Sequence, residues 1–221
     1  MTSTVLATFD SSEDAHDAIH DLTESGFNRS DIGLAVYDRD NKYVEDISGS
    51  EGAGIGAVAG SIFGGIVGLA AITIPGVGPV IAAGPLAAAI GALAGAGVGA
   101  ASGAVTGGIT GSLVKFNVPE DEADYYAESL RQGAALVSVT AHEFDADRAM
   151  AILRDHNPID IDKRVAQWRA RGWDGYDPKV DPFTAEQRAE FNAEYDADFE
   201  TPAVTSDDEV EEYRRAVRHF K

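Results

Sequence analysis

Two histidines offer the first candidate chemistry in this chain. His16 and His20 lie four positions apart, and Glu13 and Glu24 lie close by. On a helix this spacing puts two imidazoles on one face, where they can bind a divalent metal. However, these side chains flank the apolar face of the expected helix and do not converge on a pocket. We therefore interpret them as a solvated helix surface and expect no metal and no cofactor.

The other polar residues do not form a recognisable catalytic set. His142, His156 and His219 are scattered and have no nucleophile beside them. Carboxylate pairs such as Asp160 and Asp162 are common in a chain whose net charge is −20. A GxGxxG-like stretch lies inside an apolar segment and does not join a strand to a helix, as a phosphate-binding loop would. The sequence predicts a protein that is not an enzyme.

Charge and cysteine content restrict the partners and the compartment. The chain has 221 residues, with 37 acidic and 17 basic side chains and no cysteine. Such acidity argues against nucleic acid and against docking on anionic lipid headgroups. The absence of cysteine excludes disulfides and thiolate metal sites, which is typical of an intracellular protein.

The longest unusual feature is an uncharged segment between Glu51 and Lys115, which are separated by 63 residues. Glycine recurs there at every fourth position, so each run lines one face of a helix. Such stripes allow two helices to pack closely, as in membranes. The predicted helix-packing glycines are Gly52, Gly56, Gly60, Gly64, Gly68, Gly91, Gly95, Gly99, Gly103, Gly107 and Gly111.

These stripes predict a helical hairpin. A helix over residues 52–74 would be roughly 34 Å long, enough to cross a hydrocarbon core of about 30 Å. A second helix would run from Pro85 to about residue 113 or 116. The turn between them would be formed by Pro75, Gly76, Gly78, Pro79, Gly84 and Pro85. Because the turn is uncharged, both ends would share one side, which Lys42 and Lys115 indicate is cytoplasmic.

The segments flanking the hairpin each read as strand, helix, strand. The first half predicts strands at Val5–Phe9 and Ile32–Tyr37, joined by a helix that buries Ala15, Ala18, Ile19 and Leu22. After an acidic helix opened by Pro119, the second half predicts a strand at Leu136–Thr140, a helix at Asp145–Asp155 and a strand at Ile159–Val165. We therefore expect an α+β protein with a split ferredoxin-like (βαββαβ) domain, an inserted Gly/Ala-rich hairpin and a C-terminal helical tail.

Three aromatic residues, Trp168, Trp173 and Tyr176, follow the last predicted strand. They could anchor the chain at a membrane interface or cover an open face of the sheet, and we favour the second interpretation. Thr184 and Gln187 predict a capping box at the start of a helix.

A last helix is expected from Ser206, with an apolar stripe of Val210, Tyr213, Val217 and Phe220 that needs a partner. The expected divisions are 1–50 for the first βαβ half, 51–116 for the hairpin, 117–166 for the connecting helix and second half, and 167–221 for the aromatic motif and acidic tail.

Three stretches carry a resemblance to known families. VLATFDSSEDAHDAIHDLTESGF…DIGLAVYD resembles the YflT-type general stress protein domain. PGVGPVIAAGPLAAAIGALAGAGVGA with VPEDEADYYAESLRQGAALVSV, and the later WRARGWDGYDP, are similar to bacterial stress-induced membrane proteins of unknown function. The resemblance covers residues 4–178. It implies a stress-inducible, non-enzymatic protein and provides no active site; the acidic tail departs from the pattern.

The leading functional hypothesis is a stress-response protein anchored in the inner membrane by a self-associating glycine-zipper hairpin, with both termini cytoplasmic. Its expected partners are lipid and further copies of itself. An alternative is a soluble cytoplasmic assembly, in which the hairpins of many subunits form a sealed apolar layer that could contain lipid. A third hypothesis is a small-ligand sensor, since ferredoxin-like domains often bind metabolites.

Overall fold

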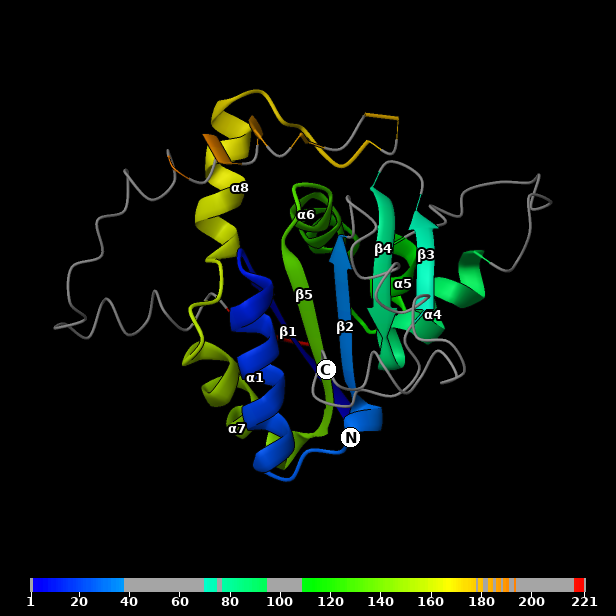
Figure 1. The fold of residues 1–221 in the computed structure, drawn as a ribbon, viewed down its shortest axis with the longest axis vertical. Helices are drawn as coiled ribbons and strands as arrows, with labels where there is room; N and C mark the ends of the chain where they lie inside the picture. The colour runs from blue at the N-terminus through cyan, green and yellow to red at the C-terminus, as the bar shows by residue number, and fades with distance from the viewer. Residues whose placement is uncertain are drawn as a thin grey trace, which may run out of the picture.

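The computed structural model describes residues 2–37, 70–74, 77–94, 109–177, 179–180, 183–184, 186–187, 189–190, 193 and 217–220. These residues form an α+β fold in which helices cover both faces of one antiparallel sheet (Figure 1). The strands are β1 Thr2–Phe9, β2 Ile32–Tyr37, β3 Ala70–Ile74, β4 Gly78–Ala83, β5 Ala135–His142 and β6 Val217–Phe220. The helices are α1 Ser12–Glu24, α4 Gly84–Ala94, α5 Ile109–Val114, α6 Glu120–Arg131, α7 Glu143–Arg154 and α8 Ile161–Ala170, with a 3-10 turn at Arg29–Asp31.

The six strands lie in the order β3-β4-β2-β5-β1-β6, and every neighbouring pair is antiparallel. The first and last described strands are adjacent, with Thr4 opposite Phe220. β5 lies between β1 and β2, so the two halves of the chain interlock in the sheet. This arrangement places the ends of α6 and α8 close to the end of β1.

Local sequence signals account for the first half of the fold. The Ser11 side chain caps α1 by accepting hydrogen bonds from the backbone N–H groups of Glu13 and Asp14. The predicted apolar face is confirmed, because Ala15, Ala18, Ile19 and Leu22 are all buried. The predicted strands over 5–9, 32–37 and 136–140 are confirmed by β1, β2 and β5, and the helix over 145–155 by α7.

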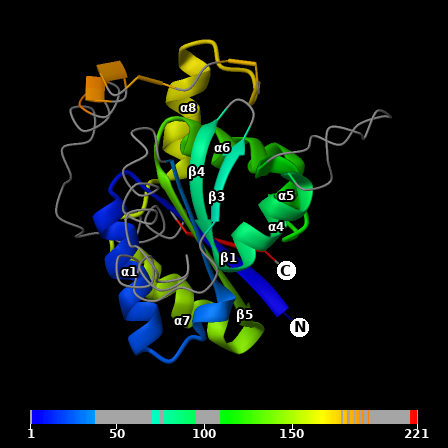
Figure 2. The ribbon, with the colours of Figure 1, turned by 45° about the vertical axis from the view of Figure 1, so that its right-hand side comes forward.

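The two faces of the sheet carry separate cores, as alternation along each strand requires. Along β1, Val5, Ala7 and Phe9 point towards α1 and α7, whereas Leu6 points to the opposite face. Figure 2 shows α1 and α7 on one side of the strands and α4 and α5 on the other. The second core holds α4, α5 and α6 against the sheet.

The expected strand at 159–165 is wrong, because Ile161–Ala170 forms helix α8. Ile159 and Ile161 alternate like strand residues, but Ile161, Val165 and Trp168 also follow a helical spacing, and these three are buried together. Asp160 decides the conformation, because its carboxylate accepts hydrogen bonds from the backbone N–H groups of residues 162 and 163.

The first helix and the turn of the expected hairpin are also wrong where the structure describes them, whereas α4 and α5 are helical within the expected second helix. Ala70–Ile74, the end of the predicted first helix, is strand β3, and Gly78 and Pro79 of the predicted turn belong to β4. Pro75 and Gly76 lie outside the described residues. Pro85 lies in the first turn of α4 as expected, and Gly84, predicted in the turn, is the first residue of α4 and has a positive φ of 61°. A Cβ there would collide with the Ile32 backbone carbonyl, so the position requires glycine.

The predicted membrane anchor is contradicted, because no helix in the described residues is long and apolar enough to cross a membrane. The membrane and inner-membrane assignments made from the sequence are therefore corrected. Gly91 lies in α4 and Gly111 in α5. The other helix-packing glycines, Gly52, Gly56, Gly60, Gly64, Gly68, Gly95, Gly99, Gly103 and Gly107, lie outside the described residues. Apolar residues of α4 and α5 pack on the sheet of their own chain.

The expected helical stripe near the C-terminus is wrong at its end. Val217–Phe220 is strand β6, paired with β1, while Ser206, Val210 and Tyr213 lie outside the described residues. Val217 joins the core under α7 and Phe220 the core under α6. β-branched and aromatic residues pair readily with an open sheet edge, so tertiary pairing overrides the helical spacing here.

Candidate functional site

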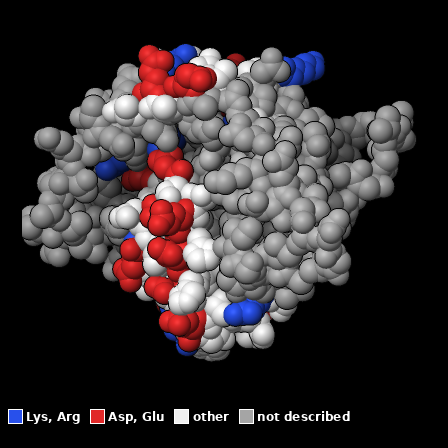
Figure 3. All heavy atoms as spheres, viewed as in Figure 1, with Lys and Arg blue, Asp and Glu red and all other residues white. Residues whose placement is uncertain are grey.

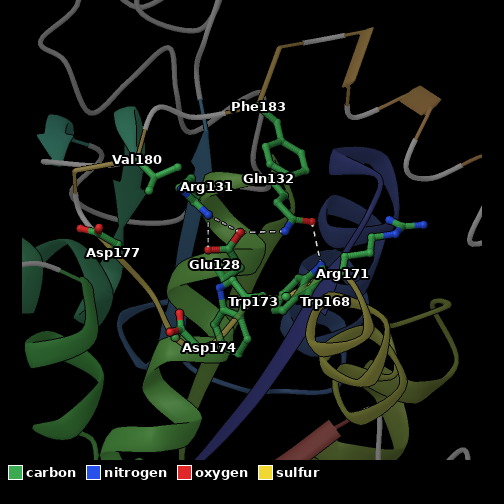
Figure 4. Close-up of a pocket in the computed structure, with 12 residues that line it drawn as sticks. Glu128, Arg131, Gln132, Trp168, Arg171, Trp173, Asp174, Asp177, Val180 and Phe183 are labelled. Carbon is green, nitrogen blue, oxygen red and sulfur yellow. Dashed lines mark hydrogen bonds and ion pairs between the residues drawn. The ribbon is translucent and has the colours of Figure 1, made fainter.

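A pocket of about 400 Å³ lies where the C-terminal end of α6 meets α8 and the segment that follows α8 (Figure 4). Its walls come from three places along the chain. They are Glu128, Arg131 and Gln132 from α6 and its cap, Trp168 from α8, and the loop residues Arg171, Gly172, Trp173, Asp174, Gly175, Asp177, Val180 and Phe183. The volume is in the usual range for a small-molecule site.

A buried hydrogen-bond chain forms the α6 wall of this pocket. Arg131 Nη2 donates to both carboxylate oxygens of Glu128 at 2.6 Å, and Gln132 Nε2 donates to Glu128 Oε1 at 2.8 Å. Gln132 Oε1 in turn accepts from the indole Nε1 of Trp168 at 3.1 Å. These contacts fix the orientation of the Gln132 amide and tie α6 to α8.

Arg131 has further donor groups that take no part in this hydrogen-bond network. Its side chain is only 5% exposed, yet Nε and Nη1 have no hydrogen-bond partner among the described residues. The indole Nε1 of Trp173, in the same pocket wall, is likewise buried without a partner there. Leaving buried donors unsatisfied costs roughly 1–3 kcal/mol each. Three such nitrogens in one pocket wall make it suited to a ligand that accepts hydrogen bonds.

Aromatic rings form a further part of the pocket wall. Trp168 and Trp173 lie with their ring centroids 5.4 Å apart and tilted by 57°, and Tyr125 packs on Trp173 at 5.9 Å. Trp168 is buried with Ile161 and Val165. Two of the three aromatics singled out from the sequence, Trp168 and Trp173, therefore line this pocket. The third, Tyr176, packs against the core under α6.

Helix α8 is held in place by a second ion pair. Arg164, which is buried, donates from Nη2 to Asp10 Oδ2 at the end of β1 over 2.6 Å. The backbone N–H of Ile159 also donates to the carbonyl of Thr8 in β1. Because β1 is the second strand from the sheet edge, these contacts fix Trp168 relative to the sheet.

The loop from 174 to 177 is held against α6 through Asp124. Partial burial raises the pKa of the Asp124 carboxyl group. The backbone N–H of Tyr176 donates a hydrogen bond to this carboxylate and lowers the pKa by less, so the net pKa is raised. Burial also raises the pKa of the Tyr176 hydroxyl to about 12, although the nearby Arg131 charge lowers it. Tyr176 therefore stays neutral at physiological pH, and its side chain adds no charge beside Arg131.

No family model, curated protein or solved structure matches this chain. The resemblance to stress proteins stays a prediction, and function has to be argued from the residues of the site.

The histidines considered first in the sequence lie elsewhere, on the outer face of α1. His20, Asp21 and Glu24 bring one ligand atom each within 4.8 Å of one another, and all three are exposed. His156, just after the end of α7, has its Nε2 3.0 Å from Asp21 Oδ2 in α1. Figure 3 shows acidic side chains running along this helix. Exposed groups of this kind are typical of a solvated surface, so the cluster carries no site on its own.

Sequence reasoning missed the α6 residues altogether. Glu128 and Arg131 lie three positions apart, a spacing that usually marks an ion pair on an exposed helix surface. Their burial depends on α8 packing across the end of α6, and α8 was expected to be a strand. The available signal was Gln132–Gly133, which marks the helix end, together with Trp168 and Trp173 further along the chain.

Proposed function

We propose that this protein binds a small molecule in the pocket between α6 and α8 and does not transform it. The observation that carries the proposal is Arg131, a buried guanidinium in the pocket wall with two nitrogens that lack partners among the described residues. A site built to hydrogen-bond a ligand leaves such groups unsatisfied when the ligand is absent.

The arrangement of the polar groups favours binding over catalysis. The buried carboxylate of Glu128 accepts three hydrogen bonds from Arg131 and Gln132, so it is engaged in holding the wall. The remaining lining residues that the structure describes include no serine, cysteine, lysine or histidine, and their two carboxylates, Asp174 and Asp177, are exposed at the mouth. What the pocket offers is orientation, hydrogen-bond donors and aromatic surface.

We also propose that β1, β2, β5 and β6 with α1 and α7 form a split ferredoxin-like unit. Its support is the strand order β2-β5-β1-β6 and the packing of α1 and α7 on one face. The fourth strand is then β6, residues 217–220. The segment inserted between β2 and β5 supplies α6, and α8 comes from the connection to β6, so the pocket lies on additions to this unit. A role in the stress response and self-association are supported only by the sequence patterns and stay predictions.

The binding proposal can be tested by blocking the pocket without disturbing its wall. Val180 lines the pocket and is 46% exposed, whereas Val114 in α5 is 43% exposed and lies outside it. Val180→Trp should fill the pocket, and Val114→Trp is the matched control. We expect a metabolite library, screened by thermal shift, to contain compounds that stabilise the wild type and the Val114 variant but not the Val180 variant.

The outcome that would contradict the proposal is equally clear. If compounds stabilise the Val180→Trp variant as strongly as the wild type, they bind elsewhere. If no compound in a broad library distinguishes the two tryptophan variants, the pocket is not a ligand site.

A further inference from the structure

We infer that the ligand is a small zwitterion, with a carboxylate directed to Arg131 and Trp173 and a cationic amine placed over the aromatic wall. This inference rests on the proposed function and adds the chemical class of the ligand. It follows from the order in which charges and rings occur between the buried wall and the mouth of the pocket.

The buried part of the wall favours an acceptor group. Arg131 presents Nε and Nη1, and Trp173 presents its indole N–H, all buried and without partners among the described residues. An indole nitrogen can only donate, and a guanidinium has no acceptor. A carboxylate has two oxygens, so it can accept one hydrogen bond from the Arg131 guanidinium and one from the indole, and the bond to the charged guanidinium is the stronger kind.

The mouth of the pocket carries more negative than positive charge. Its exposed charged lining residues are Asp174 and Asp177 against Arg171, and the backbone N–H of Lys179 donates to Asp177. Trp173, which is only partly buried and packs on the buried Trp168, provides electron-rich ring surface in the same pocket. A cationic amine is attracted both to carboxylates and to indole faces.

The net charge argues against a purely anionic ligand. The lining residues include three acidic side chains, Glu128, Asp174 and Asp177, and two basic ones, Arg131 and Arg171. The whole chain has a net charge of −20. A nucleotide or sugar phosphate would bring several negative charges into this field. A zwitterion brings none in sum, and each of its ends meets a group of opposite sign.

Two sources of this chemistry are common, a primary α-amino acid and a quaternary betaine. We would titrate the full chain by calorimetry with L-phenylalanine and with glycine betaine. 3-Phenylpropionate and phenethylamine serve as single-charge analogues of the first, and choline as the analogue of the second that lacks the carboxylate. We expect one zwitterion to bind and its single-charge analogues to bind at least about tenfold more weakly. The zwitterion that binds identifies the amine as primary or quaternary.

Variants assign each end of the ligand. Trp173→Phe keeps an aromatic ring and removes the indole donor. It should weaken binding of the zwitterion about tenfold and leave the affinity for phenethylamine or choline unchanged. Asp174→Asn together with Asp177→Asn should weaken the same zwitterion but not 3-phenylpropionate. The exposed Asp147→Asn on α7 is the matched control for loss of a surface carboxylate and should change nothing.

The failure of this inference differs from the failure of the proposed function. If 3-phenylpropionate or a neutral compound binds more tightly than both zwitterions, and Val180→Trp abolishes that binding, the ligand class is wrong and the pocket remains a ligand site. If neither zwitterion binds and no compound shows binding that Val180→Trp abolishes, both are overturned.

Discussion

The two faces of the sheet differ in what they bury. Under α1 and α7, the core is a continuous apolar cluster that includes Val5, Phe9 and Ile19. Under α6, and onwards to α8, apolar packing gives way to buried polar groups, among them Glu128, Arg131 and Gln132. Apolar packing stabilises the fold without selecting a ligand, whereas buried polar groups cost free energy unless they are paired. Both faces have an apolar core that stabilises the fold, and the difference lies at the end of α6, where we propose that the buried polar groups serve a ligand.

The largest expected effect tests the apolar face. Phe9 is fully buried there, so Phe9→Ala should lower the free energy of unfolding by about 3–5 kcal/mol. Phe144→Ala is the matched control, because Phe144 in α7 is 98% exposed, and should change it by less than about 0.5 kcal/mol. Urea denaturation measures both. A ligand found for the wild type should bind the folded Phe9 variant with unchanged affinity; a large loss of affinity would break the division between the faces.

The next effect tests the buried ion pair on the other face. Arg131→Met leaves the Glu128 carboxylate buried without its cation and should cost about 3 kcal/mol. Glu128→Gln added to Arg131→Met removes the stranded charge and should restore most of this loss. The double variant should still fail to bind ligand, because the donor groups of Arg131 are gone. Stability restored together with binding would show that Arg131 is not part of the site.

A smaller effect separates the two tryptophans. Trp168→Phe removes the indole N–H that bonds to Gln132 and should destabilise the fold by about 1–2 kcal/mol. Trp173→Phe removes an indole N–H without a partner among the described residues, so it should cost less than Trp168→Phe and mainly reduce ligand binding. Thermal unfolding of the two variants side by side gives the comparison. Equal destabilisation would mean that the Trp173 nitrogen is bonded in solution.

The smallest effect is a pH dependence at the loop. Burial raises the pKa of Asp124 above its ordinary value of 3.8, so the folded chain holds this proton more tightly than the unfolded chain. Its contribution to stability is therefore present at low pH and declines as the pH rises from 3.8 through the raised pKa. Asp124→Asn should flatten that decline in unfolding experiments across this range. Glu122→Gln should act in the same direction, since burial raises the Glu122 pKa too; a steeper decline in either variant would contradict the assignment.

Sequence predicted the elements that depend on local pattern. α1 and its cap at Ser11, β2, β5 and α7 follow from periodicity and capping, and the reciprocal bonds between Thr184 and Gln187 occur as expected for a capping box. The conformations of α8 and β6 were wrong, because Ile159–Val165 satisfies both periods and Val217–Phe220 is short enough for sheet pairing to decide.

Sequence patterns could not predict the candidate site, because it depends on tertiary contacts. Trp168 and Trp173 were recognised as unusual, but their partners on α6 were not, since Glu128 and Arg131 have the spacing of an ordinary surface pair. The uncharged segment was misread for a related reason. An apolar face gives the same composition whether it packs on lipid or on the sheet of its own chain, as the buried parts of α4 and α5 do.

The measurement that tests the central claim most directly is a nuclear magnetic resonance titration of the two indole N–H signals. The chain contains two tryptophans, so the indole region holds two peaks, which Trp168→Phe and Trp173→Phe assign. On addition of L-phenylalanine or glycine betaine, we predict a saturable shift of the Trp173 peak as its N–H gains an acceptor, with a smaller change at Trp168, which is already bonded to Gln132. A Trp173 peak that stays in place at millimolar concentrations of both compounds would contradict the assignment of this pocket as a site for small zwitterions.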